Sequence, residues 1–187
     1  MNKKVVLGIA GGLMALCLCL GAAGFIAVRS AGWFLSRTVV SDTQTVSTTG
    51  TAIADYTLPA GFDDGYAANV GGFSLVSYTA VDGQSHIYLL QAPPALKLDQ
   101  AQMEQQGNLS SGSNGWAEVQ VVEQQPCQIR GQETTLVISE GINHDGQRYR
   151  SASAVFEGND GLALVNISGP AGSWDQEMVD AFIESFN

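Results

Sequence analysis

Residues 5–28 form an apolar run of 24 residues, VVLGIAGGLMALCLCLGAAGFIAV, without a charged side chain. A helix of this length measures about 36 Å at a rise of about 1.5 Å per residue, and the hydrocarbon core of a bilayer is about 30 Å thick. The run therefore predicts a transmembrane helix over 5–28, preceded by a short cytoplasmic tail over 1–4. Everything after residue 28 is then expected on one side of a membrane.

A cleaved signal peptide is the alternative to this anchor. Lys3 and Lys4 precede the run, and Gly21, Ala22 and Ala23 are small residues of the kind found at cleavage sites. However, secretory apolar segments usually span only about 7 to 15 residues. Cleavage after Ala23 would also leave an apolar mature terminus, so the length of the run favours an uncleaved anchor.

The orientation follows from the charges of the whole chain. Lys3 and Lys4 flank one end of the run, and Arg29 and Arg37 flank the other, so these basic residues alone decide little. All 18 acidic side chains lie at or beyond Asp42, and a large acidic domain is more naturally exported. The predicted location is the cell membrane, crossed once, with a cytoplasmic N-terminus and an extracytoplasmic C-terminal domain.

Gly8 and Gly12 form a GxxxG pair within the apolar run, a spacing that lets two helices approach closely. They are candidate helix-packing residues, with chance in a glycine-rich span as the alternative. The expected partners are therefore the lipid bilayer and other membrane-protein subunits.

The charge of the soluble part excludes another class of partner. From Asp55 onward, 17 acidic and four basic side chains give a net charge of −13. Such a domain repels the phosphates of nucleic acids. No nucleic-acid partner is expected.

The segment between the apolar run and this domain is rich in Ser and Thr. Residues 38–54 lack a sustained apolar period, so we expect a juxtamembrane segment and flexible tether over 29–54. Because β-branched residues dominate 38–54, an ordered edge strand in part of it is the alternative. Residues 55–187 are expected to form a single extracytoplasmic domain.

Alternation of apolar and polar residues indicates several strands in this domain, and turn sequences between them indicate antiparallel hairpins. Asp63-Asp64-Gly65 is interpreted as a turn, and Asp82-Gly83 as a hairpin turn. The predicted strands are 73–79, 86–91, 116–123, 133–140, 147–156 and 162–168.

Two helices are expected beside these strands. Asp99 can cap a short helix that ends at Gln106, and an apolar stripe with a period near 3.6 predicts a longer helix over 174–186. Ser173 and Gln176 form a plausible capping box for the latter. The predicted fold class is α+β, an N-terminal transmembrane helix followed by one antiparallel-sheet domain with packed helices.

The order of these elements resembles the PsbP-like families, over about residues 56–187. The residues that carry the resemblance are Leu58-Pro59-Ala60-Gly61-Phe62, the pattern Ile129-x-Gly131-x-Glu133, and AFIESF at 181–186. These families include extrinsic lumenal photosystem subunits and exported bacterial domains. The resemblance implies a membrane-associated accessory or assembly role without shared catalytic residues.

Few residues are suited to catalysis, so the chain is not expected to be an enzyme or to hold a cofactor. His86 and His144 are the only histidines, and Cys127, between Pro126 and Gln128 in an expected loop, is the only cysteine after the apolar run. No GxSxG sequence occurs. No catalytic residue is predicted.

With so many carboxylates, a metal ion would be expected to bind here through hard oxygen ligands. Asp63 and Asp64 could bind calcium weakly with Asp145 or Asp160, but none matches an EF-hand spacing. Aspartate near glycine is explained by turn formation, so no metal site is predicted.

Arg148 and Arg150 share one face of a predicted strand in this acidic domain. They are candidate contacts to an acidic partner or a ligand carboxylate, because arginine binds carboxylates with two hydrogen bonds. The alternative is that they pair with Glu133 or Glu140 across a hairpin.

The leading hypothesis is a membrane-anchored, non-enzymatic extracytoplasmic domain that serves as an accessory subunit or assembly factor of a membrane complex. A second hypothesis is a membrane-tethered binder that captures a small apolar or lipid ligand between sheet and helix. An enzyme with an unrecognised site is the third.

Overall fold

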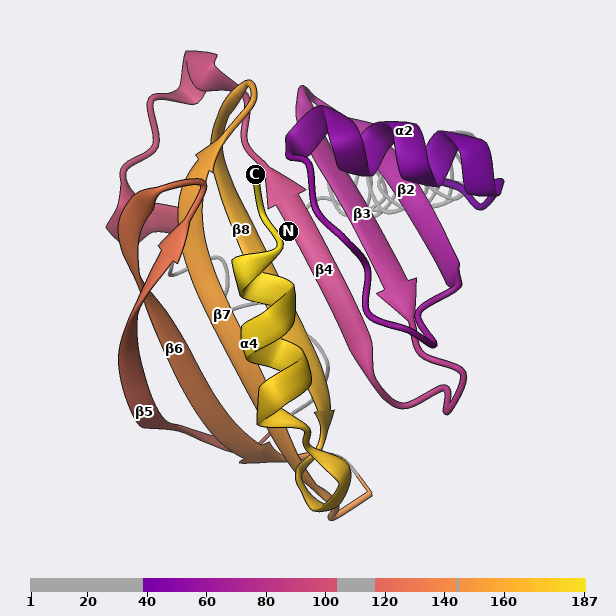
Figure 1. Ribbon diagram of the computed structural model, residues 1–187, viewed down its shortest axis with the longest axis vertical. Coiled ribbons are helices and arrows are strands. Elements are labelled where there is room, and N and C mark those ends of the chain that lie inside the picture. Colours follow the sequence, from indigo (N-terminus) through magenta and orange to yellow (C-terminus); the bar gives the residue numbers. More distant parts are fainter. Residues whose placement is uncertain (1–38, 104–116, 144) are drawn as a thin grey trace, which may run out of the picture. The chain divides into compact units, whose positions relative to one another are not determined.

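The computed structural model describes residues 39–103, 117–143 and 145–187. Eight strands form one sheet in the order β1-β2-β3-β4-β8-β7-β6-β5 (Figure 1). Each pairing from β2 to β5 is antiparallel. The strands are β1 (Val39–Val40), β2 (Asp64–Val70), β3 (Phe73–Thr79), β4 (His86–Gln91), β5 (Ala117–Ile129), β6 (Gln132–Ile142), β7 (Arg148–Gly158) and β8 (Gly161–Pro170).

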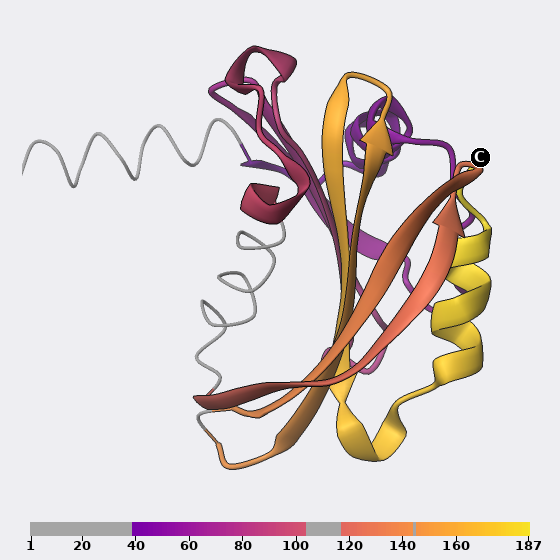
Figure 2. The same cartoon turned by 90° about the vertical axis from the view of Figure 1, so that its left-hand side faces the viewer.

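Two α-helices cover the same face of this sheet. Helix α2 (Thr43–Ile53) lies over β2 and β3, and α4 (Gln176–Glu184) lies along β8 (Figure 1). Figure 2 shows both helices on one side of the sheet. Two single turns of 3₁₀ helix, η1 (Pro94–Leu96) and η2 (Ala171–Ser173), and a helical segment over 100–103 are also described.

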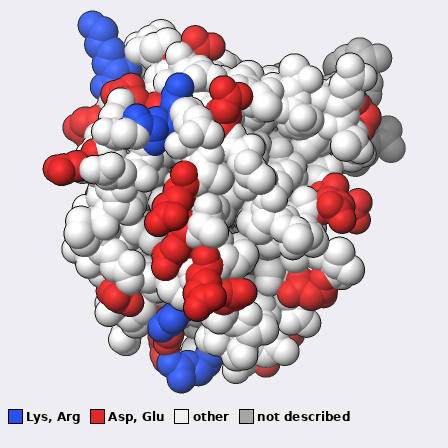
Figure 3. All heavy atoms as spheres, in the orientation of Figure 1, with Lys and Arg blue, Asp and Glu red and all other residues white. Residues whose placement is uncertain are grey.

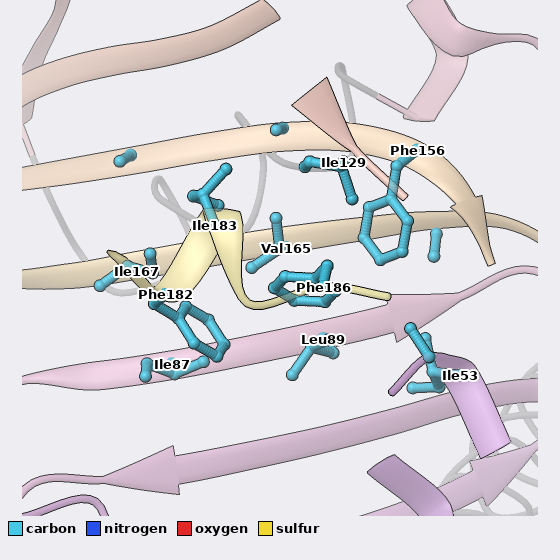
Figure 4. Close-up of a cluster of buried hydrophobic side chains, with 14 of the residues drawn as sticks. Ile53, Ile87, Leu89, Ile129, Phe156, Val165, Ile167, Phe182, Ile183 and Phe186 are labelled. Carbon is cyan, nitrogen blue, oxygen red and sulfur yellow. The ribbon is translucent and has the colours of Figure 1, made fainter. Parts of the chain in front are cut away.

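The main hydrophobic core lies between the sheet and the two helices (Figure 4). Phe182 of α4 is 1% exposed, and its ring centroid lies 5.1 Å from that of Phe186 in an edge arrangement. Strand residues alternate between faces, so every second residue of β4 and β8 points to these rings. These buried strand residues are Ile87, Leu89, Ala163, Val165 and Ile167.

The buried residues of α2 lie on one face of the helix, which packs into the core. Its buried residues, Val46, Thr49, Gly50 and Ile53, follow the i, i+3, i+4, i+7 spacing of one helix face. At the N-terminus, the Thr45 amide donates to a carboxylate oxygen of Asp42 at 2.9 Å, which caps the first turn.

The tether predicted over 38–54 is therefore wrong for residues 43–53. Ile53 is fully buried, and its carbonyl accepts from the Asn159 amide at 2.8 Å, in the turn between β7 and β8. The alternative of an edge strand holds only for β1. The prediction failed because Thr49 and Gly50 occupy half of the buried face, which hides its apolar period.

The predicted fold class is also corrected. The described residues are mostly an antiparallel sheet with few helices. Each of the four strands β5 to β8 is ten or more residues long. Among the described residues, no helix is long and apolar enough to cross a membrane. The apolar run at 5–28, on which the predicted transmembrane helix falls, lies outside the described residues.

Several local predictions are confirmed. β3 and β4 have the predicted bounds, and β6, β7 and β8 begin and end within two residues of them. The Asp82 carboxylate accepts from the amides of Gln84 and Ser85 at 2.8 and 2.9 Å, which closes the predicted hairpin turn. The apolar stripe of the C-terminal helix is buried as expected.

Other local predictions are wrong. Asp64 and Gly65 begin strand β2 rather than form a turn. Cys127 lies within β5 and not in a loop, since this edge strand continues through a proline. Asp175, not Ser173, caps α4 by accepting from the Met178 amide at 3.0 Å.

The N-terminal half of β5 differs from its predicted burial. The alternation of Ala117, Val119 and Val121 in the sequence predicts a half-buried strand over 116–123, but Val119 and Val121 are 39% and 52% exposed. Two register irregularities, between 117 and 120 and between 121 and 123, break the alternation of the strand at this point.

The short helix predicted to end at Gln106 is described only over residues 100–103, which are helical, and its remainder lies outside the described residues.

Candidate binding pocket

A pocket of about 640 Å³ opens between α2, the segment 56–65 and the start of β2. This volume falls in the range of small-molecule sites, about 300 to 1,000 Å³. Its walls are apolar and aromatic, and its rim carries hydroxyl and carboxylate groups. The lining residues are Ser41, Thr43, Val46, Ser47, Thr51, Tyr56, Leu58, Phe62, Asp63, Asp64, Gly65 and Tyr78.

Two glycines let the elements around this pocket approach closely. A Cβ atom on Gly50 would overlap the Tyr56 hydroxyl and lie 2.8 Å from that of Tyr78. On Gly65, a Cβ would lie 2.6 Å from the backbone carbonyl oxygen of Ser77. The missing side chain at Gly50 therefore lets α2 approach the two tyrosine hydroxyls, and the missing side chain at Gly65 lets β2 approach the backbone of β3.

Replacing Gly65 by alanine is expected to lower the free energy of unfolding by about 1–3 kcal/mol, because the added methyl group overpacks against backbone that cannot rotate away. Urea titration of the full chain followed by circular dichroism measures this loss. Gly172 is the matched control, since a Cβ there meets nothing within 4 Å. An equal response of the two alanine variants contradicts the close approach at Gly65.

The floor of the pocket holds a pair of tyrosine hydroxyls. The oxygens of Tyr56 and Tyr78 lie 2.7 Å apart and share one hydrogen bond. Tyr78 is only 4% exposed. Burial raises the pKa of both phenols above its usual range, and for Tyr56 the hydrogen bond to Tyr78 raises it further. Both tyrosines therefore stay neutral at physiological pH.

Because of this pair, the free energy of unfolding is expected to fall at alkaline pH. Unfolded tyrosines ionise near pH 10, whereas Tyr56 in the folded chain resists ionisation, so the folded state binds more protons and loses stability as pH rises above about 10. Tyr56→Phe is expected to make this loss shallower. Urea titrations of wild type and variant between about pH 9 and pH 11 measure it. If the free energy of unfolding falls equally steeply with pH in wild type and Tyr56→Phe, Tyr56 is not the source of the pH dependence.

The rim of the pocket is acidic. Asp63 and Asp64 are both exposed there, and the lining residues include no Lys, Arg or His. Figure 3 shows carboxylates over much of the helix-bearing face, with basic side chains gathered near its two ends. Among the described residues, no group of three His, Cys, Asp or Glu side chains could hold a metal ion. Asp63 and Asp64 place two exposed carboxylates at the mouth of the pocket.

The predicted contact residues Arg148 and Arg150 lie together at a different place, on β7. Both bind the carboxylate of Glu140 on β6, at 2.6 and 2.9 Å. The alternative of cross-hairpin pairing is thus what the structure shows, with Glu140 and not Glu133. Burial opposes ionisation of Glu140, but the hydrogen bonds from the two arginines outweigh it and lower its pKa. Contact of these arginines with a partner stays a prediction.

The other chemically interesting residues are scattered. The His86 ring nitrogen lies 3.2 Å from the Thr79 hydroxyl, and burial lowers the pKa of His86 although Asp82 opposes this. Burial also raises the pKa of the Cys127 thiol on β5, which keeps it protonated. His144, Gly8 and Gly12 lie outside the described residues.

Sequence reasoning missed this pocket as a site, although it placed a candidate ligand between sheet and helix. The local signal for it is the helical spacing of Val46 and Ile53, and Thr49 and Gly50 on the same face weaken this signal. The contact of Tyr56 with Tyr78 carries no local sequence signal.

Comparison with known proteins shows the fold. No protein-family model matches the sequence, and no curated protein matches it. The solution structure of cyanobacterial PsbP (CyanoP) from Synechocystis sp. PCC 6803 is similar, with a TM-score of 0.51 and 12% identity over 80% of this chain and 92% of that chain. The weak resemblance to PsbP is thus confirmed at the level of the fold.

A second solved structure is similar to a lesser degree. LpqN, involved in cell envelope biogenesis of Mycobacterium tuberculosis, matches with a TM-score of 0.41 and 10% identity, over 71% of this chain and 81% of that chain. This likeness is too low to support an argument about function.

Proposed function

We propose that the chain is a non-enzymatic accessory domain that works on the extracytoplasmic side of a membrane, as a subunit or assembly factor of a membrane complex. The observation that carries this proposal is the fold shared with cyanobacterial PsbP. The PsbP-like families include extrinsic subunits that act by binding to a larger complex. The net charge of −13 over 55–187 favours a partner with a basic surface.

Crosslinking in intact membranes, followed by affinity purification of the tagged full chain, tests the proposal. We expect the same partner subunit to be recovered in stoichiometric amount from independent preparations. The matched control is the Ile53→Asp variant, whose fold is expected to be strongly destabilised. A partner that is recovered equally with this control binds non-specifically. Recovery of the wild-type chain alone contradicts the proposal.

Within this proposal, Arg148 is a contact residue. Its side chain is 73% exposed and only one of its nitrogens is hydrogen-bonded to Glu140, so other donors of the guanidinium face solvent. Arg148→Ala is expected to lower the recovered partner severalfold. Lys97→Ala, which removes an exposed basic residue elsewhere, is expected to leave the recovery unchanged. Equal recovery with the two variants contradicts the contact.

A second candidate function is favoured by the pocket beside α2, namely holding a small apolar ligand or lipid between helix and sheet. Val46, Leu58 and Phe62 supply apolar walls for such a ligand. Native mass spectrometry of the full chain, purified under mild conditions, is expected to show a bound small molecule. Protein that is empty in every preparation contradicts this function.

A further inference from the structure

Three aromatic residues, Tyr56, Phe62 and Tyr78, line the pocket beside α2. Phe62 is 5% exposed and Tyr78 is 4% exposed, so both rings are largely removed from water. The faces of aromatic rings carry partial negative charge and attract organic cations, more strongly where the site is desolvated. The interior of the pocket therefore suits a cation with an apolar body better than a purely apolar molecule.

The charges at the mouth of the pocket act in the same direction. Asp63 and Asp64 each place an exposed carboxylate on the rim, and none of the lining residues is basic. A positively charged ligand is attracted to this rim, whereas a fatty acid or an anionic headgroup is repelled. The aromatic interior and the acidic rim are independent features, and both select positive charge.

The tyrosine pair adds one directional group. The two hydroxyls share a single hydrogen bond, so one phenol proton is used within the pair and the other has no acceptor among the described residues. Because Tyr56 and Tyr78 both line the pocket, this proton can be donated to a hydroxyl or carbonyl oxygen of a ligand.

We propose that this pocket binds a small organic cation, an amine or quaternary ammonium group on an apolar body. The inference rests on the ligand-holding function and names the chemical class of the ligand. The ammonium group lies between the ring of Phe62 and the carboxylates of Asp63 and Asp64, and the apolar body lies against Val46 and Leu58.

Three water-soluble probes that share one apolar body test the proposal: 3-phenylpropan-1-amine, 3-phenylpropan-1-ol and 3-phenylpropanoate. They are cationic, neutral and anionic at neutral pH. Their binding to the purified full chain is measured by ligand-observed NMR titration at low salt, where surface charge is least screened. We expect the amine to bind about five- to tenfold more tightly than the carboxylate, with the alcohol between them.

Matched variants locate the binding. Ser47→Trp places a large ring on the rim of the pocket and is expected to weaken binding of the amine at least about tenfold. Thr48→Trp, at the next and equally exposed position outside the lining, is expected to leave the affinity unchanged. Asp63→Asn with Asp64→Asn is expected to bring the affinities for the three probes close together.

The possible failures can be distinguished. Equal affinity of the wild-type chain for all three probes overturns the cation class but leaves ligand holding in place. If Ser47→Trp and Thr48→Trp change the affinity for the amine equally, the assignment of binding to this pocket is overturned. If none of the three probes binds, the cation class is overturned. If native mass spectrometry also finds the chain empty, the ligand-holding function fails as well.

Discussion

Replacing Ile53 by aspartate is expected to destabilise the domain by more than about 4 kcal/mol. Ile53 is fully buried in the main core, so its loss removes about 1.5–3 kcal/mol of hydrophobic transfer, and the carboxylate adds the cost of a buried charge without a partner. Whole domains are stable by only about 5–15 kcal/mol, so this loss is a large fraction of the total stability. Urea titration of the full chain, followed by circular dichroism, measures the loss.

Two controls separate burial from other effects of this substitution. Ile53→Val keeps the position apolar and is expected to cost only about 0.5–1.5 kcal/mol. Thr48→Asp introduces the same carboxylate on the exposed side of α2 and is expected to change stability by less than about 0.5 kcal/mol. If Ile53→Asp behaves like Thr48→Asp, then α2 does not contribute to the core.

Phe182→Ala is the second substitution with a large expected effect, a loss of about 3–5 kcal/mol. The ring is 1% exposed, and its centroid lies 5.8 Å from that of Tyr56 and 5.1 Å from that of Phe186. Removing it leaves a cavity between α4 and β4 that these neighbours cannot fill without leaving their own contacts (Figure 4). The same urea titration measures the loss.

Glu184→Ala is the matched control on α4, because this side chain is exposed two residues further along the helix. It is expected to change stability by less than about 0.5 kcal/mol. A loss for Phe182→Ala of only this size would contradict the position of Phe182 at the centre of the core.

The elements that could be predicted from sequence are those with an unbroken pattern. Val179, Phe182, Ile183 and Phe186 recur at helical spacing, so the C-terminal helix and its burial follow from the sequence alone. The hairpin turn at Asp82 needs only local hydrogen bonds. The pairing of arginines on β7 with Glu140 could also be predicted, because residues two apart on a strand share a face.

The elements that could not be predicted have weak side-chain signals. β2 contains Gly65, Ala67 and Ala68, small residues with little hydrophobic contrast between faces, so its alternation is hard to detect. In α2, Thr49 and Gly50 are buried by contact with the sheet and the tyrosines, although neither is strongly apolar. In both elements tertiary packing outweighs the local preference.

The pocket could not be predicted because its residues come from separate segments. Tyr56 and Tyr78 are 22 positions apart and meet only once α2 and β3 are in place. Asp63 and Asp64 suggested a turn or a weak calcium site, and their role at the pocket mouth depends on the packing of α2 beside them.

The pocket, and the ligand class inferred from it, exist only while α2 stays packed on the sheet. Hydrogen exchange of the backbone amides of 46–53 in the full chain tests this most directly. The fold predicts exchange on the order of a thousandfold slower than in an unstructured peptide, with β4 as the protected internal reference. Exchange at the rate of an unstructured peptide, as a flexible tether would show, would contradict the packing of α2 and the pocket with it.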